Sequence, residues 1–442
     1  MEVILIKAAQ LILSLSILVI IHEFGHFILA RVFKTRVEKF YLFFDPWFSL
    51  FKVKKGETEY GIGWLPLGGY VKISGMIDES MDKEAMKLPA QPYEFRAKKT
   101  WQRLLIMLGG VVMNFILAFI VYIGILYAWG EEYLPNANVK YGIEVNEVGK
   151  QIGLQNGDKI LTVGNQYVEN FQQIIPTVLL DNARTIQVER NGEKVNVDIS
   201  DDDIALLIKS KAVISLRTPF DYKAFNVLKN SAAQVAGLQA GDQIVGMNNQ
   251  KYQYNDQFKT ALKDSVGKTI SLNVVRNNVE MTLPLTVPES GMLGIELHPD
   301  IEKIFEFKTI KYGLFESIPA GINKGISTIG DYLKQFKLIF SPKTKAYESL
   351  GGFIAIGNIF PGMWNWHSFW NMTAFLSIIL GVMNLLPIPA LDGGHVMFLL
   401  FEMITGRKPG DKFMEYAQIA GMALLLSLVL YANGNDIFKL FK

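Results

Sequence analysis

Long apolar stretches alternate with polar segments along the chain. Residues 4–33, 104–129 and 369–391 are each long enough for the roughly 20-residue helix that crosses a bilayer, and residues 416–431 form a shorter fourth stretch. The pattern predicts a polytopic α-helical membrane protein with about four transmembrane helices. The sequence does not fix the ends of the last helix. Because Glu2 precedes Lys7 and no small-x-small cleavage site follows early, we interpret the first stretch as a retained helix rather than a signal peptide.

Lys and Arg residues predict that two of the connections between these stretches are cytoplasmic. One connection joins the first two stretches and is basic at both ends, and the other is the turn between the third and fourth stretches. The residues concerned are Arg31, Lys34, Arg36, Lys39, Arg96, Lys98, Lys99, Arg103, Arg407, Lys408 and Lys412. The N-terminus, residues 130–365 and the C-terminus are then extracytoplasmic. Lys439 and Lys442 oppose this assignment.

The long segment between the second and third stretches contains an internal repeat. Gly-Leu-Gln-Asn-Gly-Asp-Lys-Ile at residues 153–160 recurs as Gly-Leu-Gln-Ala-Gly-Asp-Gln-Ile at residues 237–244. Alternating strand-like runs follow each copy. With the Ser-Ala-Ala-Gln-Val-Ala that precedes it, the second copy resembles a PDZ domain, and the first copy matches more loosely. We therefore expect two PDZ-like α/β domains; two β-rich domains with similar turns are the alternative.

The composition limits the chemistry that the chain can carry. Half of the residues are apolar, and the formal net charge is +2. No basic block with interleaved aromatic side chains is present, so we expect no nucleic-acid partner. The chain has no cysteine. Any metal ion must therefore be held by His, Asp or Glu.

The first apolar stretch contains the sequence His22-Glu23-Phe24-Gly25-His26. On a helix, His22 and His26 project from one face and can hold one metal ion, and Glu23 beside them is placed to take a proton from a water on that ion. Ionisable side chains inside a membrane span are costly, and they are functional by default. The alternative is a polar patch that is hydrogen-bonded to neighbouring helices.

A catalytic zinc site needs a third protein ligand and an open position. The longer motif of soluble zinc proteases is not completed after His26, and Glu38 lies beyond the predicted helix. Asp392, in a Leu-Asp-Gly sequence at the end of the third stretch, remains. At a rise of about 1.5 Å per residue, His22 lies roughly 27 Å from residue 4, near the cytoplasmic side, and the third stretch runs in the same direction. We therefore expect His22 and Asp392 at a similar depth.

At these residues the chain resembles the bacterial site-2 proteases of the RseP type. The resemblance rests on His-Glu-x-x-His in the first helix, Leu-Asp-Gly in a later one and the PDZ-like repeat between them, and it covers essentially the whole chain. It implies one zinc ion per chain, held by His22, His26 and Asp392, with Glu23 as general base. His395 is a candidate second-sphere group or alternative ligand; a polar residue near the interface is the competing interpretation.

A transmembrane substrate must unwind before hydrolysis, because a helix hides its own amides. Residues 50–75 are similar to the membrane-reentrant β-hairpin of the family, which implies a strand that binds the substrate by β-addition. The candidate substrate-binding residues there are Gly61, Gly63, Gly68, Gly69, Tyr70 and Val71. An amphipathic hairpin on the membrane surface is the alternative. Asn384, Pro387 and Pro389 resemble the family's Asn-Pro-Pro segment for substrate binding, and a simple helix kink is compatible with that role.

The resemblance implies an intramembrane zinc metalloprotease that cleaves transmembrane segments of single-pass membrane proteins in regulated intramembrane proteolysis. Its substrates would include anti-sigma factors shortened by another protease, and signal-peptide remnants. Two alternatives from other classes are a non-catalytic PDZ-containing sensor or scaffold, and a metal transporter. The family often has Gly-Pro-x-x-Asn in its second span. Gly110 and Asn114 keep this spacing here, but Val111 stands in place of the proline.

The expected fold is thus a polytopic α-helical membrane protein with a cytoplasmic-side membrane-associated β-hairpin region and two extracytoplasmic PDZ-like α/β domains. The expected location is the bacterial cytoplasmic (inner) membrane, with the active site toward the cytoplasmic side. The expected parts are an N-terminal membrane part with two transmembrane helices and the hairpin region (1–129), two PDZ-like domains (130–215 and 216–303), an amphipathic helix and linker (304–365), and a C-terminal membrane part with two transmembrane helices (366–442).

Overall fold

The computed structural model describes residues 2–66, 68–76, 89–210, 212–223, 225–297, 300–341, 344 and 346–441. Leu67 of the predicted hairpin region and residues 298–299 of the second predicted PDZ-like domain lie outside these ranges. The chain forms two compact units. The first comprises Met1–Glu131, Lys311–Phe336 and Tyr347–Lys442, and the second comprises Glu132–Ile310 and Lys337–Ala346.

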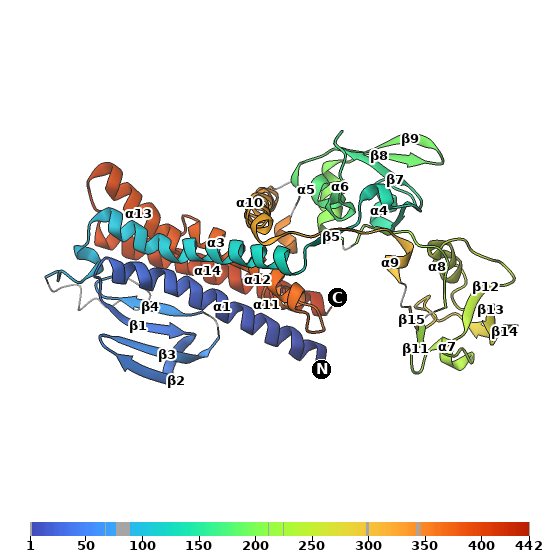
Figure 1. The fold of residues 1–442 in the computed structure, drawn as a ribbon, viewed down its shortest axis with the longest axis horizontal. Helices are drawn as coiled ribbons and strands as arrows, with labels where there is room; N and C mark the ends of the chain where they lie inside the picture. Colours follow the sequence, from blue (N-terminus) through green and yellow to red (C-terminus); the bar gives the residue numbers. More distant parts are fainter. Residues whose placement is uncertain are drawn as a thin grey trace. The chain divides into compact units, whose positions relative to one another are not determined.

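Four helices in the described part of the first unit are long and apolar enough to cross a membrane, which confirms the predicted number of spans. They are α1 (Glu2–Val32), α3 (Thr100–Ala128), α12 (Trp366–Leu385) and α14 (Asp411–Leu440). The second of these, α3, packs against both α1 and α12 (Figure 1). The last helix extends beyond the predicted residues 416–431 at both ends.

The third apolar stretch does not form one helix. The helix α12 ends at Leu385, and a further helix, α13 (Asp392–Thr405), begins after a short link. Pro387 and Pro389 in that link have no N–H to donate within a helix, so the span stops there. The expectation that Asp392 ends the third span is therefore wrong, because Asp392 is the first residue of α13.

In the part of the first unit that the structure describes, two more α-helices are α10 (Leu314–Ile339), over most of its length, and α11 (Phe353–Asn358). The amphipathic helix predicted within residues 304–365 corresponds to α10, and its glycines allow close packing on α3. A Cβ at Gly321 would lie 2.6 Å from the backbone nitrogen of Ile123, and one at Gly325 would overlap the Phe119 ring. The C-terminal half of α3 is therefore covered by α12 and α10 together.

The predicted hairpin region is part of a four-stranded sheet that lies against α1 (Figure 1). Its strands are β1 (Val37–Leu42), β2 (Phe44–Lys55), β3 (Thr58–Leu65) and β4 (Tyr70–Ile73). The spatial order is β2-β3-β1-β4, with β1 and β3 parallel and the other neighbours antiparallel. At one edge, β2 exposes the apolar side chains of Trp47, Phe48, Leu50 and Phe51. At the other edge, β4 lies next to α1.

The second unit contains two β-rich lobes with separate apolar cores. The elements of the first lobe are β6 (Ile143–Val145), α4 (Glu147–Gln151), β7 (Lys159–Val163), α5 (Ile174–Leu180), β8 (Thr185–Arg190), β9 (Glu193–Asp198), α6 (Asp201–Lys209) and β10 (Ile214–Leu216). Those of the second are β11 (Phe225–Val227), α7 (Ala232–Val235), β12 (Gln243–Met247), α8 (Asn255–Lys263), β13 (Thr269–Arg276), β14 (Val279–Thr286) and β15 (Ile295–Leu297). Phe305 packs in the core of the first lobe, although it lies beyond the second lobe in the sequence.

The sequence repeat has the same structural role in both lobes. In the first, Asp158 accepts hydrogen bonds from Arg190 at 2.8 and 2.7 Å, and in the second, Asp242 accepts them from Arg276 at 2.7 Å. Each aspartate is 1% exposed. Each pair ties the repeated turn to a strand of a three-stranded sheet, β7-β8-β9 or β12-β13-β14. Buried acid–base pairing therefore explains why the Gly-Asp pair occurs twice.

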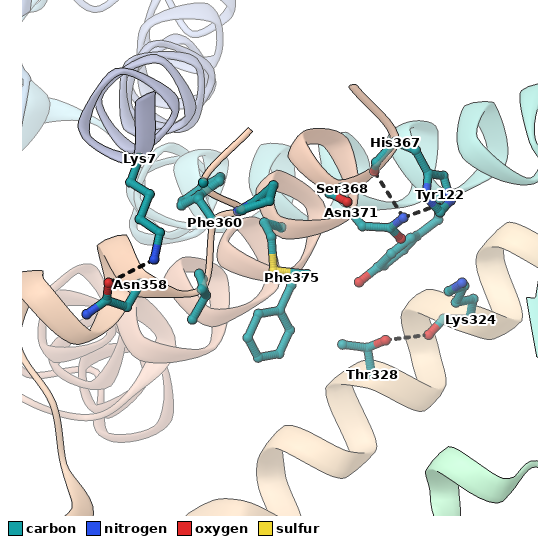
Figure 2. A pocket seen from close by; sticks show the side chains of 14 residues that line it. Lys7, Tyr122, Lys324, Thr328, Asn358, Phe360, His367, Ser368, Asn371 and Phe375 are labelled. Atoms are coloured by element: carbon teal, nitrogen blue, oxygen red, sulfur yellow. Dashed lines mark hydrogen bonds between the residues drawn. The ribbon is translucent and has the colours of Figure 1, made fainter. Parts of the chain in front are cut away.

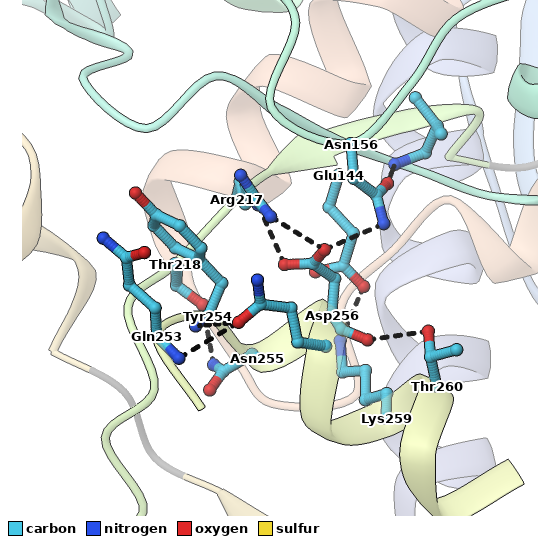
Figure 3. Close-up of polar contacts among 12 residues, drawn as sticks. Glu144, Asn156, Arg217, Thr218, Gln253, Tyr254, Asn255, Asp256, Lys259 and Thr260 are labelled. Carbon is cyan, nitrogen blue, oxygen red and sulfur yellow. Dashed lines mark hydrogen bonds and ion pairs between the residues drawn. The ribbon is translucent and has the colours of Figure 1, made fainter. Parts of the chain in front are cut away.

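A polar network joins the two lobes (Figure 3). Arg217 follows the last strand of the first lobe, and its guanidinium donates to the Asp256 carboxylate on α8 at 2.9 and 3.2 Å. The Asn156 carboxamide donates to the same carboxylate at 2.9 Å. The Arg217 guanidinium also lies 3.8 Å from the centre of the Tyr254 ring. Because Asp256 is only 6% exposed, this interlobe contact is shielded from solvent.

Candidate metal centre

The two motif histidines lie where α1 and α3 approach most closely. His22 and His26 are four residues apart on α1 and are 8% and 7% exposed. Glycines permit this contact: a Cβ at Gly25 would lie 2.8 Å from the backbone nitrogen of Gly110, and one at Gly110 would lie 2.6 Å from Cε1 of His22. The imidazoles therefore occupy space that a side chain on α3 would otherwise fill.

Asp392 completes a triangle of donor atoms with the two histidines. Its Oδ2 lies 3.2 Å from Nε2 of His22 and 3.3 Å from Nε2 of His26, and the two Nε2 atoms are 3.3 Å apart. These three residues form a candidate metal-binding group within the described part of the chain, and His395 is not a member of it. The structure thus brings Asp392 to two histidines that precede it by more than 360 positions in the sequence.

The size of the triangle fits a zinc ion. Zinc with nitrogen or oxygen ligands at about 2.0–2.1 Å in tetrahedral geometry has ligands about 3.3–3.4 Å apart. The observed edges of 3.2–3.3 Å are close to that spacing. Asp392 Oδ2 is also buried without a hydrogen-bond partner, which is costly for a carboxylate oxygen unless a cation balances it. The donor set therefore suits a metal ion bound on one face and open on the other.

Hydrogen bonds at the opposite ring nitrogens orient both imidazoles. Nδ1 of His26 lies 2.8 Å from the Ile106 carbonyl oxygen, which can only accept, so the proton is on Nδ1 and Nε2 has a free lone pair. Nδ1 of His22 lies 3.0 Å from the Asn114 carboxamide nitrogen, while Asn114 Oδ1 is buried without a partner. Turning the amide by 180° would let Oδ1 accept the Nδ1 proton and would free Nε2 of His22 for a metal as well.

A cavity of about 360 Å³ opens beside the triangle. Glu23 lines it together with the three donor residues, and part of the opposite wall comes from the sheet. The wall residues include Gly69, Tyr70, Val71, Lys72 and Ile73. The Tyr70 hydroxyl donates to Asp45 at 2.8 Å. Burial and this hydrogen bond raise the pKa of the Tyr70 phenol, which keeps it neutral beside the cavity.

The predicted substrate-binding residues divide into two groups. Gly69, Tyr70 and Val71 line the cavity, whereas Gly61, Gly63 and Gly68 are not among its described lining. Instead, a Cβ at Gly61 would lie 2.7 Å from the Tyr41 hydroxyl, one at Gly63 would lie 2.6 Å from the Phe43 carbonyl oxygen, and one at Gly68 would lie 2.9 Å from the Phe44 ring. Gly61 and Gly63 thus pack closely within the sheet, and Gly68 packs against the Phe44 ring beside it.

The C-terminal end of α12 and the link to α13 also lie close to the site. The Asn384 carboxamide nitrogen is 3.3 Å from Nε2 of His22, and Pro387 and Pro389 form the link that leads to Asp392. The sequence indicates Asn114 only as part of an incomplete family motif, without a role, and it gives no indication of the Ile106 carbonyl. A polar side chain four residues after a glycine in an apolar span was the available signal for Asn114, whereas a main-chain carbonyl leaves no signal.

A second cavity, of about 700 Å³, lies elsewhere in the first unit (Figure 2). Its described lining includes Lys7, Lys324 and His367 but no acidic side chain. Lys7 donates to Asn358 at 3.1 Å, and Asn371 contacts His367 at 3.1 Å. None of the three triangle residues lines this cavity, so we assign it no part in hydrolysis.

Comparisons with known proteins identify the family of the chain. A profile described as Peptidase family M50 matches residues 10–428. The regulator of sigma E protease of Haemophilus influenzae is 28% identical over 97% of this chain and 98% of its own length. The Escherichia coli regulator of sigma-E protease RseP is 29% identical over 98% of each chain. A Treponema pallidum protein whose name contains the words zinc metalloprotease is 27% identical over 99% of this chain and 100% of its own length. Since the family profile spans nearly the whole sequence, the chain belongs to peptidase family M50 and is a metalloprotease.

Proposed function

We propose that the chain is an intramembrane zinc metalloprotease in which His22, His26 and Asp392 hold one zinc ion and Glu23 is the general base. The observation that carries the proposal is the buried triangle of donor atoms, whose edges of 3.2–3.3 Å fit tetrahedral zinc. The triangle lies among membrane-spanning helices, so the peptide bond within reach is that of a membrane-embedded segment. A metal transporter or a PDZ-containing scaffold would not need Glu23 on the turn between the two histidines.

Each residue of the site has a chemical task in hydrolysis. A zinc ion bound there supplies Lewis acidity toward a water molecule and the scissile carbonyl. Glu23 lines the same cavity and takes the proton of the attacking water, then passes it to the leaving amine. The Ile106 and Asn114 contacts at the Nδ1 atoms orient both imidazoles, so that their Nε2 atoms face the metal position. Asn384, next to His22, is placed to hydrogen-bond the unwound substrate backbone near the cleaved bond.

The edge strand β4 provides a place for the substrate. It pairs with β1 on one side and is the last strand in the described order of the sheet. Gly69, Tyr70 and Val71 line the cavity beside the metal triangle. A substrate segment that adds to this edge would be held extended, with its amides satisfied, next to the catalytic groups. This arrangement favours single-pass membrane proteins whose helices unwind readily, such as anti-sigma factors already shortened by another protease and signal-peptide remnants.

The basic residues flanking the spans favour an orientation in which the sheet and the metal triangle face the cytoplasm. The two lobes, which we take to be PDZ-like, would then lie outside the bacterial inner membrane. The absence of native cysteine makes this sidedness directly testable. We expect a cysteine at Glu289, in the second lobe, to react with a membrane-impermeant maleimide in intact spheroplasts. A cysteine at Lys52, on β2, should react only after permeabilisation. The reverse pattern would invert the proposed topology.

Cleavage itself is tested with the purified chain in liposomes with a single-pass substrate. We expect Glu23→Gln to abolish cleavage while it retains zinc, because the amide cannot accept the proton and Glu23 is not a ligand. The matched control is Glu57→Gln, at a glutamate whose side chain is 61% exposed. Equal cleavage by wild type and Glu23→Gln would refute the proposed base. Zinc flux without cleavage would favour the transporter, and neither activity would favour the scaffold.

A further inference from the structure

The last helix, α14, is buried at few positions. Among the side-chain positions of α14 that the structure describes, the buried ones are Gln418, Gly421 and Asp436. Gln418 is 7% exposed on a helix that otherwise presents mainly apolar side chains outward. A buried carboxamide at membrane depth is costly unless it is hydrogen-bonded, so its partner indicates what the side chain does.

Gln418 and Gly421 meet one peptide group of the link before Asp392. The Oε1 atom of Gln418 accepts a hydrogen bond from the backbone N–H of Ala390 at 3.1 Å. One turn further along α14, a Cβ at Gly421 would overlap the Pro389 carbonyl and lie 3.0 Å from Pro389 Cα. The carbonyl of Pro389 and the N–H of Ala390 belong to the same peptide. The last helix therefore contacts both ends of this peptide.

This peptide leads into an unusual backbone conformation. Ala390 has φ of 82°, in the left-handed region that L-residues with a Cβ disfavour. Such a conformation persists only where surrounding contacts hold it. Ala390 lies two residues before Asp392, and its φ sets the direction in which the chain enters α13. A relaxation of Ala390 would therefore move the Asp392 carboxylate away from the two imidazoles.

We propose that Gln418 is a positioning residue for Asp392: its hydrogen bond holds the Ala390 peptide so that the carboxylate reaches the metal triangle. This inference rests on the proposed function, because it takes Asp392 to be a zinc ligand. It assigns the last span a part in the metal site, although none of its residues belongs to the triangle. The prediction concerns metal affinity directly and cleavage only as a consequence.

The test measures the zinc dissociation constant of the full-length chain in detergent by chelator competition. Gln418→Leu keeps the side-chain bulk but removes the acceptor, and we expect the dissociation constant to rise about 10-fold, as for other supporting groups of metal ligands. Adding Ala390→Gly to Gln418→Leu should restore most of the affinity, because glycine adopts a positive φ without strain. A general loss of packing would not be rescued by that glycine.

The matched control is Asp436→Leu at the opposite end of α14. Asp436 accepts hydrogen bonds from the backbone N–H groups of Gly352 and Ala355 at 3.0 and 2.9 Å, so its loss loosens the same helix far along its length from Gln418. We expect it to lower thermal stability and leave zinc affinity unchanged. If Gln418→Leu and Asp436→Leu weaken zinc equally, or if Gln418→Leu binds zinc like the wild type, the positioning role is refuted.

Asp392→Ala separates this inference from the proposed function. If Asp392→Ala loses zinc and Gln418→Leu does not, the positioning role fails and the ligand set stands. If Asp392→Ala binds zinc as tightly as the wild type, the proposed ligand set fails and takes the positioning role with it. Weak zinc binding by both variants, with rescue by Ala390→Gly, supports both.

Discussion

Gly110→Ala tests whether His22, His26 and Asp392 are arranged as they would be around a bound metal ion. The new Cβ would lie 2.6 Å from Cε1 and 2.8 Å from Nδ1 of His22. Optimal carbon contacts are about 3.5–4.0 Å, so the rings must move by roughly 1 Å, whereas metal–ligand distances tolerate only about 0.2 Å. The Cβ would also overlap Nε2 of His26. Moving either ring would strain its hydrogen bond to α3, at Asn114 for His22 and at the Ile106 carbonyl oxygen for His26. We expect zinc affinity to fall at least 10-fold, the scale of a misoriented ligand, and cleavage to be lost.

Gly124→Ala is the matched control on the same helix. A Cβ at Gly124 meets no atom within 4 Å, so that variant only gains the helix propensity of alanine, about 1 kcal/mol. Gly110→Ala gains the same propensity but adds an overpacking cost of about 1–3 kcal/mol, for a net destabilisation of roughly 0–2 kcal/mol. Both variants should therefore fold, which thermal unfolding checks. Chelator competition then gives the decisive result: if Gly110→Ala binds zinc as tightly as Gly124→Ala, the two imidazoles do not converge on an ion at this place.

Two further predictions follow from contacts outside the triangle. Asn114→Ala should lower zinc affinity about 10-fold, because His22 loses the partner that fixes its tautomer. Asn114→Asp keeps an acceptor and should lower the affinity less. Equal zinc affinity in the wild type and both variants would contradict this role of Asn114. Hydrogen bonding and the charge of Arg276 lower the pKa of Asp242 in the folded protein. The pair therefore stabilises the second lobe fully at pH values above the unfolded pKa of about 3.9. This contribution is lost as the pH falls through the folded pKa. Hydrogen-exchange protection of β13, corrected for intrinsic rates, should fall on acidification in the wild type, and Arg276→Met should start lower and change less.

The sequence was most informative about the candidate metal ligands, because their residue types and their expected depth in the membrane agree. His22 and His26 stand four apart in an apolar helix, and Asp392 is an acid that the apolar stretches bring to a similar depth, so their meeting followed from rise per residue and helix direction. Hydropathy was less informative about boundaries. It merged α12 with the link to α13, because Pro387 and Pro389 are as apolar as the residues of a span but cannot donate within a helix. It also gave no sign that residues 37–42 join the hairpin to make a four-stranded sheet.

The missed residues share a physical reason. Ile106 acts through its carbonyl, which every residue has, and Gln418 acts through a backbone N–H near a ligand that is 26 residues away in the sequence. Their roles depend on which peptide groups tertiary packing leaves unpaired, and residue type alone does not reveal this. Among the candidate substrate residues, Gly61 and Gly69 look equivalent in sequence. Only the folded structure shows that Gly61 packs on the Tyr41 ring and that Gly69 lines the cavity beside the metal triangle.

The glycines at the contact between α1 and α3 couple membrane packing to chemistry. Lipid tails are as apolar as leucine, so helices in a bilayer gain little from apolar burial and associate through close packing, which small residues allow. Gly25 and Gly109 supply that close approach, and Gly110, next in line, leaves room for the imidazoles. Substitution at Gly25 should therefore disturb helix association and metal binding together. Substitution at Gly110 should disturb metal binding more than helix association, because its Cβ would meet ligand atoms rather than the opposing backbone.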